Sequence, residues 1–140
     1  MNLPLDGILV VSMEQAVAGP FCSNRLRLAG ARVIKVERND SGDFARGYDT
    51  AAAGESSYFI WLNQGKESIA LNLKKPEDKK IFESIVSKAD ILVENFKPGT
   101  LEKWGLGWKE LSKKYPKLIY ASASGFGQTG PLKELPAYDM

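Results

Sequence analysis

The residues best suited to ligand chemistry follow an apolar run at 91–93, which reads Ile-Leu-Val. Asn95, Phe96 and Lys97 come directly after this run and offer an amide, a flat aromatic face and a cation in succession. Such a set suits a ligand with amide, aromatic and phosphate parts. A buried strand followed by an ordinary surface turn explains the same residues, and composition alone favours that plainer interpretation.

Arg38 is a second candidate, because it ends a β-branched run and its guanidinium could bind a phosphate with two hydrogen bonds. Taken alone, an arginine at this point is more often a solvated cation at a strand end. The glycine-rich segment at 124–131 reads Ser-Gly-Phe-Gly-Gln-Thr-Gly-Pro. It lacks the Gly-Lys-Ser/Thr ending of a phosphate-binding P-loop and is therefore not one.

Composition limits the available chemistry. The 140-residue chain has no histidine, which removes His-based acid–base catalysis and His metal ligands, and no metal is expected. Its one cysteine, Cys22, excludes an internal disulfide, fits a reducing compartment and is interpreted as a small buried side chain on a helix. The net charge of +2 gives no electrostatic case for nucleic acid or membrane. With no apolar run long enough to span a membrane, cytosol or an organelle matrix is the expected location.

The elements that must position these residues alternate between strand and helix patterns. Apolar runs predict strands at 7–12, 31–38, 67–73, 91–93 and 118–123, and helical spacing predicts helices at 20–28, 76–89, 100–104 and 108–115. A long loop is expected at 39–54, and the aromatic run at 58–62 is expected to pack inside. The pattern predicts one α/β domain over residues 1–140, a Rossmann-like open, mostly parallel sheet with flanking helices.

Four loops should meet at one edge of this sheet. They lie at 15–20, 37–42, 95–99 and 124–130, each after a predicted strand. The carboxyl ends of parallel strands share an edge, and open α/β sheets bind their ligands there. The first loop also leads into a helix N-terminus, which attracts anions.

A dinucleotide site is another interpretation of the same edge. Glu37 ends the second strand, where a ribose-binding acid would lie. However, residues 16–20 supply one usable glycine in place of G-x-G-x-x-G, so a pyrophosphate could not approach the backbone. An NAD-binding oxidoreductase domain is therefore the weaker alternative. A noncatalytic interaction module is compatible with every feature and predicted by none.

Long runs of the sequence resemble the class III CoA-transferases, a family that includes formyl-CoA and carnitine CoA-transferases. Ala-Gly-Ala-Arg-Val-Ile-Lys-Val-Glu-Arg at 29–38 and Val-Glu-Asn-Phe-Lys-Pro-Gly at 93–99 carry the resemblance, which extends from Pro4 to Asp139. It implies the N-terminal part of an interlocked-dimer CoA-transferase fold, hence the front portion of a longer, homodimeric subunit. Without the remainder, apolar surface should be exposed around 58–62 and 91–93.

The resemblance also implies a coenzyme A site at the predicted sheet edge. Arg38 would meet the nucleotide phosphates, and residues 71–74 would flank the adenine. Lys103 stands where transferases often carry an arginine, and it keeps the charge without the two-pronged geometry. The residues implied to bind coenzyme A are Ala16, Val17, Ala18, Arg38, Leu71, Asn72, Leu73, Lys74, Asn95, Phe96, Lys97, Lys103, Tyr138 and Asp139.

The implied reaction moves CoA from an acyl-CoA to a small carboxylic acid. An aspartate attacks the thioester and forms a mixed anhydride, then an enzyme-bound CoA thioester. The resemblance places that aspartate beyond Met140, so Asp139 is interpreted as a site-lining acid and no catalytic residue is predicted within the chain. Tyr138 stands where the related alpha-methylacyl-CoA racemases carry a histidine that moves the α-proton. Transfer is therefore favoured, with racemisation as the close alternative.

Overall fold

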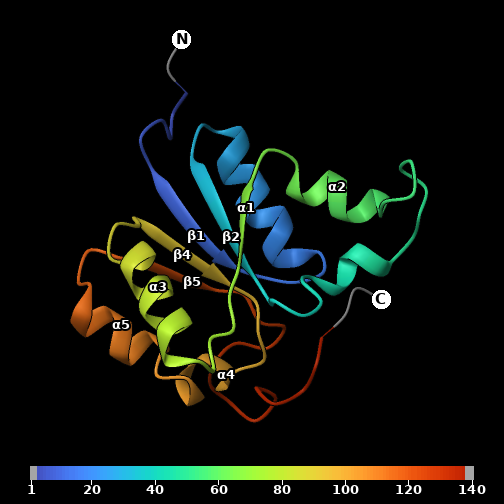
Figure 1. Ribbon diagram of the computed structural model, residues 1–140. Coiled ribbons are helices and arrows are strands. Elements are labelled where there is room, and N and C mark those ends of the chain that lie inside the picture. Colours follow the sequence, from blue (N-terminus) through green and yellow to red (C-terminus); the bar gives the residue numbers. More distant parts are fainter. Residues whose placement is uncertain (1–2, 138–140) are drawn as a thin grey trace.

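The computed structural model describes residues 3–137, and the statements below concern this part of the chain. Its centre is one parallel sheet of five strands, β1 (Leu9–Met13), β2 (Arg32–Glu37), β3 (Glu67–Ala70), β4 (Ile91–Glu94) and β5 (Ile119–Ser122). The order β3-β2-β1-β4-β5 places β1 in the middle, as in a Rossmann-type sheet (Figure 1). The predicted fold class is confirmed.

Helices cover both faces of this sheet (Figure 1). The helices α1 (Ala18–Leu28) and α2 (Ser57–Asn63) lie on one side, together with the 3₁₀ helix η1 (Phe44–Gly47). On the other side lie α3 (Pro76–Val86), α4 (Thr100–Lys103) and α5 (Trp108–Lys114). Among the described residues, no helix has the length and apolarity needed to cross a membrane.

Two apolar cores follow from the alternation of side chains along β1. Val10 belongs to a core with Val33 and Val93, against which Leu26 of α1 packs. Val11 faces the opposite way, into a larger core that includes Phe82 of α3. Because successive side chains of a strand point to opposite faces, a central strand covered on both sides is mostly apolar, as β1 is apart from Ser12.

Local sequence explains where the main helices begin and end. Pro76 occupies the first turn of α3, where its missing N–H is not needed, and Glu77 and Asp78 complement the helix dipole there. Gly30 follows α1 with a φ of +110°, a conformation that glycine adopts without steric cost. These boundaries were expected from the sequence.

Three local expectations were wrong. Cys22 is exposed instead of buried, because α1 turns Gly19, Pro20, Ser23 and Asn24 inward. The segment at 39–54 is not a plain loop, since it contains η1. The run at 58–62 forms α2, and of its apolar residues only Leu62 is fully buried.

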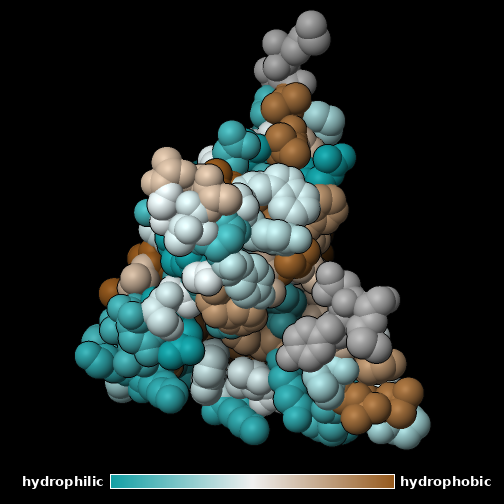
Figure 2. Space-filling view, turned by 90° about the vertical axis from the view of Figure 1, so that its right-hand side faces the viewer, coloured by the Kyte–Doolittle hydropathy of each residue, from teal (hydrophilic) through white to brown (hydrophobic). Residues whose placement is uncertain are grey.

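Exposed aromatic residues form a continuous strip, which we call the aromatic surface. Phe21 contacts Trp61, Trp61 contacts Tyr58, Tyr58 contacts Tyr48 and Tyr48 contacts Phe44, with ring centroids 5.8–6.1 Å apart. The side of the molecule that carries α2 and η1 faces the viewer in Figure 2, where pale and brown side chains mix with hydrophilic ones. Exposed apolar surface around 58–62 was expected, whereas the expectation for 91–93 was wrong.

The residues at 92–93 are buried because β4 lies between β1 and β5 and both of its faces are covered. The strand β3 is shorter than predicted and mostly exposed, as is typical of an edge strand.

Candidate functional site

Two adjoining cavities lie at the carboxyl edge of the sheet, where the four loops were expected to meet. The first has a volume of about 440 Å³ and is lined by loops that follow β1, β2, β3 and β4. The second has a volume of about 1040 Å³ and lies between the loops that follow β1, β4 and β5, with η1 and α2 beside it. Gln15 and Phe96 line both cavities.

The residues that the resemblance assigned to coenzyme A divide between these cavities. Those of the first cavity are Arg38, Leu71, Asn72, Leu73, Lys74 and Phe96. Those of the second are Ala16, Val17, Ala18, Asn95, Phe96 and Lys97. Lys103 lines neither cavity and lies exposed on α4. Tyr138 and Asp139 lie outside the described residues.

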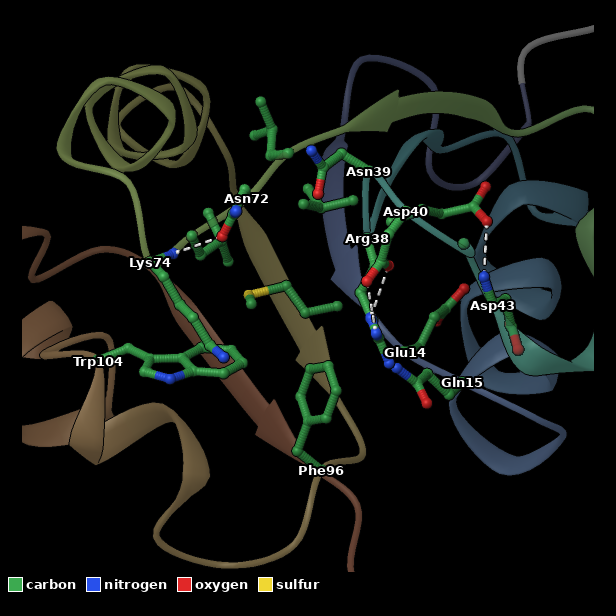
Figure 3. Close-up of a pocket in the computed structure, with 16 residues that line it drawn as sticks. Glu14, Gln15, Arg38, Asn39, Asp40, Asp43, Asn72, Lys74, Phe96 and Trp104 are labelled. Carbon is green, nitrogen blue, oxygen red and sulfur yellow. Dashed lines mark hydrogen bonds and ion pairs between the residues drawn. The ribbon is translucent and has the colours of Figure 1, made fainter.

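The first cavity has two walls of different character. Arg38, Asp43 and Gln15 lie on one side of it, and Lys74 and Trp104 lie on the other (Figure 3). Its floor is apolar, because Met13, Val36, Leu71 and Leu73 also line it. A flat apolar group with a charged substituent fits such a lining.

Arg38 lies at the mouth of the first cavity and is paired with Asp40. Its Nε and terminal nitrogen donate to the two carboxylate oxygens at 3.0 and 2.7 Å. Hydrogen bonds from Arg38 lower the pKa of Asp40 to about 2. Both side chains are more than 60% exposed, so this pair is weak and a phosphate could compete for the guanidinium.

The loop between β1 and α1 is held by side chains from other loops. The amide of Asn95 accepts the N–H of Gln15 at 2.8 Å and donates to the carbonyl of the same residue at 2.9 Å. Gly19 permits this approach, because a Cβ there would lie 2.9 Å from the Asn95 amide and 2.8 Å from Cβ of Glu14. Its role is therefore close packing.

A network of buried charges lies behind this loop. The Lys66 ammonium donates to Glu14 at 2.7 Å, and the Lys35 ammonium donates to Asp43 at 2.6 Å, with all four side chains at most 2% exposed. Asn63 accepts from both ammonium groups, at 2.9 and 3.0 Å. Burial lowers the pKa of Lys66, and the neighbouring Glu14 carboxylate opposes this effect.

Two atoms of this region have no partner among the described residues, Oε2 of Glu14 and Oγ of Ser12. Both are buried, and buried polar atoms of this kind are usually bonded to ordered water.

Glu37 is unavailable for the ribose contact that an NAD site would need. Its buried carboxylate accepts two hydrogen bonds from Arg46, one from Ser68 at 2.7 Å and one from the N–H of Asp43 at 3.0 Å. Burial alone would raise the pKa of this carboxyl, but the four donors outweigh it and lower the pKa to about 2. With its acceptor sites filled by protein groups, Glu37 has a structural role.

Glu94 ends β4 beneath Phe96, which lines both cavities. It accepts the N–H of Phe96 at 2.8 Å and the hydroxyl of Ser122. Burial raises the pKa of Glu94, although these hydrogen bonds oppose the increase. The ring of Phe96 packs edge-to-face against Trp104, with centroids 6.1 Å apart. Phe96 is thus held through its backbone by Glu94 and through its ring by Trp104.

The buried network of Glu14, Lys35, Asp43 and Lys66 was not predicted from the sequence. The available signal was Lys35, a charged residue inside a run of β-branched residues, which needs a partner if the strand is buried on both faces. In the described part of the chain, no group of three or more Cys, Asp or Glu residues is arranged to hold a metal ion.

Comparison with known sequences identifies the family to which this fold and its chain belong. The model of CoA-transferase family III matches residues 5–140, so the chain belongs to that family. It is 50% identical to acetyl-CoA:oxalate CoA-transferase of Acetobacter aceti over 136 residues, which cover 97% of this chain and 35% of that protein. It is 40% identical to human succinyl-CoA:glutarate CoA-transferase over 137 residues, covering 97% of this chain and 31% of that protein.

A solved structure agrees with these relatives. The crystal structure of a CaiB/BaiF family protein from Brucella suis matches 99% of this chain and 38% of that chain, with a TM-score of 0.92 and 40% identity. The chain spans about a third of the length of the curated relatives it matches.

Proposed function

We propose that this chain is the coenzyme A-binding part of a CoA-transferase, which moves CoA between an acyl-CoA and a small carboxylic acid. The observation that supports it best is the pair of adjoining cavities at the carboxyl edge of the sheet. In a chain that belongs to CoA-transferase family III, these cavities bring together eleven of the residues that the resemblance assigned to coenzyme A.

The shapes of the cavities suggest how the substrate lies. The adenine occupies the first cavity against its apolar floor, with Arg38 binding a phosphate at the mouth. The acyl-carrying arm then passes Gln15 and Phe96, which line both cavities, and enters the second one. The small side chains of Ala16 and Ala18 leave room for it there. In this arrangement the chain binds and orients the thioester.

As the resemblance implies, an aspartate beyond Met140, and not Asp139, supplies the nucleophile in this proposal, and the chain alone is therefore inactive. Its carboxylate oxygen attacks the thioester carbon, and the CoA thiolate leaves as a mixed anhydride forms. The thiolate then attacks the aspartyl carbonyl, which releases the donor acid and leaves an aspartyl CoA thioester. The acceptor carboxylate reverses these two steps. The working enzyme is proposed to be an interlocked homodimer of longer subunits, located in the cytosol or an organelle matrix.

Calorimetry on the protein at its natural length tests the binding role. Coenzyme A should bind more tightly than NAD, and Arg38→Ala should weaken CoA binding about 10- to 100-fold through loss of a charge-assisted contact. Arg32→Ala is the matched control, because Arg32 is an exposed arginine of β2 that pairs with Glu67 and lines neither cavity. It should leave CoA binding unchanged.

NAD binding as tight as CoA binding, or equal effects of the two arginine substitutions, would overturn the assignment. An acyl-transfer assay distinguishes a CoA-transferase from the close alternative, a racemase. A protein that exchanges the α-proton of 2-methylacyl-CoA in deuterium oxide without transferring CoA is a racemase.

A further inference from the structure

The loop between β1 and α1 contains a residue in a conformation that its type disfavours. Ala16 has a φ of +63°, in the left-handed region, where the Cβ atom of an L-residue crowds the backbone. Such strain persists only where the surroundings fix it. Ala16 lines the second cavity and its neighbour Gln15 lines both, so whatever fixes this loop also shapes the walls of the cavities.

The N–H of Ala16 is held by Asp43, which precedes η1. Oδ1 of Asp43 accepts this N–H at 3.1 Å and also accepts the N–H of Ala45 at 2.9 Å. One carboxylate oxygen therefore connects the strained residue to the first turn of η1. Together with the two bonds between Asn95 and Gln15, this contact holds three backbone polar groups of two consecutive residues of the loop.

A buried cation fixes Asp43 in turn. Its Oδ2 accepts from Lys35 at 2.6 Å, and the two side chains are 0% and 1% exposed. Lys35 is itself held by Asn63, at 2.9 Å. Because desolvation offsets most of the attraction within such a pair, a buried ion pair is a weak source of stability. It does, however, fix the direction in which the other carboxylate oxygen points.

We propose that Asp43, with Lys35 as its counter-ion, is a positioning residue that holds Ala16 in its left-handed conformation and so shapes the wall of the substrate cavities. The part of this role that concerns coenzyme A rests on the proposed function. The part that concerns the loop does not. Asp43 also lines the first cavity, but both of its carboxylate oxygens are engaged by Lys35 and the N–H groups of Ala16 and Ala45, so its proposed role is exerted through the backbone of its neighbours.

Asp43→Asn in the protein at its natural length tests both parts. An amide cannot accept from Lys35 and from both backbone N–H groups, because one of its two ends is a donor. Hydrogen exchange at the Ala16 amide, measured without ligand, should accelerate about 10-fold or more, and CoA affinity should fall about 10-fold or more. Asp49→Asn is the matched control, because Asp49 accepts the N–H groups of Ala51 and Ser57 and lines neither cavity.

A second variant separates positioning from general stability. Glycine adopts a positive φ without steric cost, so Ala16→Gly should make the loop less dependent on Asp43. In the Ala16→Gly background, Asp43→Asn should therefore change CoA affinity by no more than about threefold. If Asp43 contributed only to the overall stability, Ala16→Gly would not reduce the effect of Asp43→Asn on CoA affinity.

Hydrogen exchange in the unaltered protein is a further test. The amides of Ala16 and Ala45 share one acceptor atom, so both should be protected and should exchange at similar rates. Rapid exchange at Ala16, unchanged CoA affinity in Asp43→Asn, or absence of rescue by Ala16→Gly would overturn the role of Asp43. If the loop responds as expected but the unaltered protein binds no CoA, the positioning role stands and the proposed function fails.

Discussion

Glu37→Gln should destabilise the protein in a way that depends on pH. In the native structure the Glu37 carboxylate is 4% exposed and accepts hydrogen bonds from Arg46, Ser68 and the backbone of Asp43. Glutamine retains one acceptor oxygen and places an NH₂ group among these donors. The substitution therefore removes a charge and leaves at least one donor without a partner.

The size of the effect follows from the pKa of Glu37, which falls from 4.5 to about 2 on folding. A lowered acid pKa stabilises the folded state above the unfolded value, and that stability is lost as pH falls from 4.5 toward 2. The difference corresponds to about 3 kcal/mol at pH 7, and the solvent screening of the half-exposed Arg46 reduces it to about 2 kcal/mol. The deficit of the variant should thus be greatest at neutral pH and shrink in acid.

Urea denaturation of the natural-length protein between pH 3 and 7, at constant ionic strength, measures this difference. Glu67→Gln is the matched control, because Glu67 also binds an arginine through both oxygens but lies on the exposed strand β3. It should lower the free energy of unfolding by no more than about 1 kcal/mol. A deficit that stays constant across the pH range, or an equal deficit in Glu67→Gln, would refute the reasoning.

Gly19→Ala should destabilise by about 1–3 kcal/mol because its Cβ would overlap Glu14 and Asn95, whereas Gly47→Ala, whose Cβ meets nothing within 4 Å, should be nearly neutral in thermal melts. Burial raises the pKa of Glu94, so the native protein loses stability as pH rises from 4.5 through that raised pKa. Glu94→Gln should therefore gain stability relative to the unaltered protein over this pH range. A relative loss of stability in denaturation experiments would contradict burial as the cause of the raised pKa. The 140-residue chain alone should associate through its aromatic surface, as measured by light scattering, and should lack acyl-transfer activity. A monomeric, active chain would contradict the proposal that this chain only binds the substrate.

The sheet could be predicted from the sequence because its strands are short apolar runs between strong turn signals. The run at 91–93 stops abruptly at polar residues, and α1 has Pro20 in its first turn and is followed by Gly30. Cys22 was misplaced for a specific reason. The inward face of α1 carries Gly19, Pro20, Ser23 and Asn24, which are small or polar residues that the spacing of apolar residues does not mark as buried.

The candidate site was predicted in part. Topology alone brings the ends of parallel strands together, so the loops at 15–18 and 95–97 could be expected to meet. The buried charges could not, since Lys35 finds its partners Asp43 and Asn63 at separations of 8 and 28 residues. The helix α2 was missed because its aromatic residues are exposed, contrary to the usual link between apolarity and burial.

The pairing of β1 with β4 has a consequence for how the protein is made. Gln15 and Asn95 contact each other across 80 residues of sequence, and the strands β2 and β3 are synthesised between them. One edge of β1 therefore stays without its neighbour until residue 94 has left the ribosome. An open edge next to apolar Val10 and Val11 is a template for pairing with other chains. The nascent polypeptide is thus most prone to aggregate before β4 emerges, and β4 both closes that edge and brings Asn95 and Phe96 to the cavities.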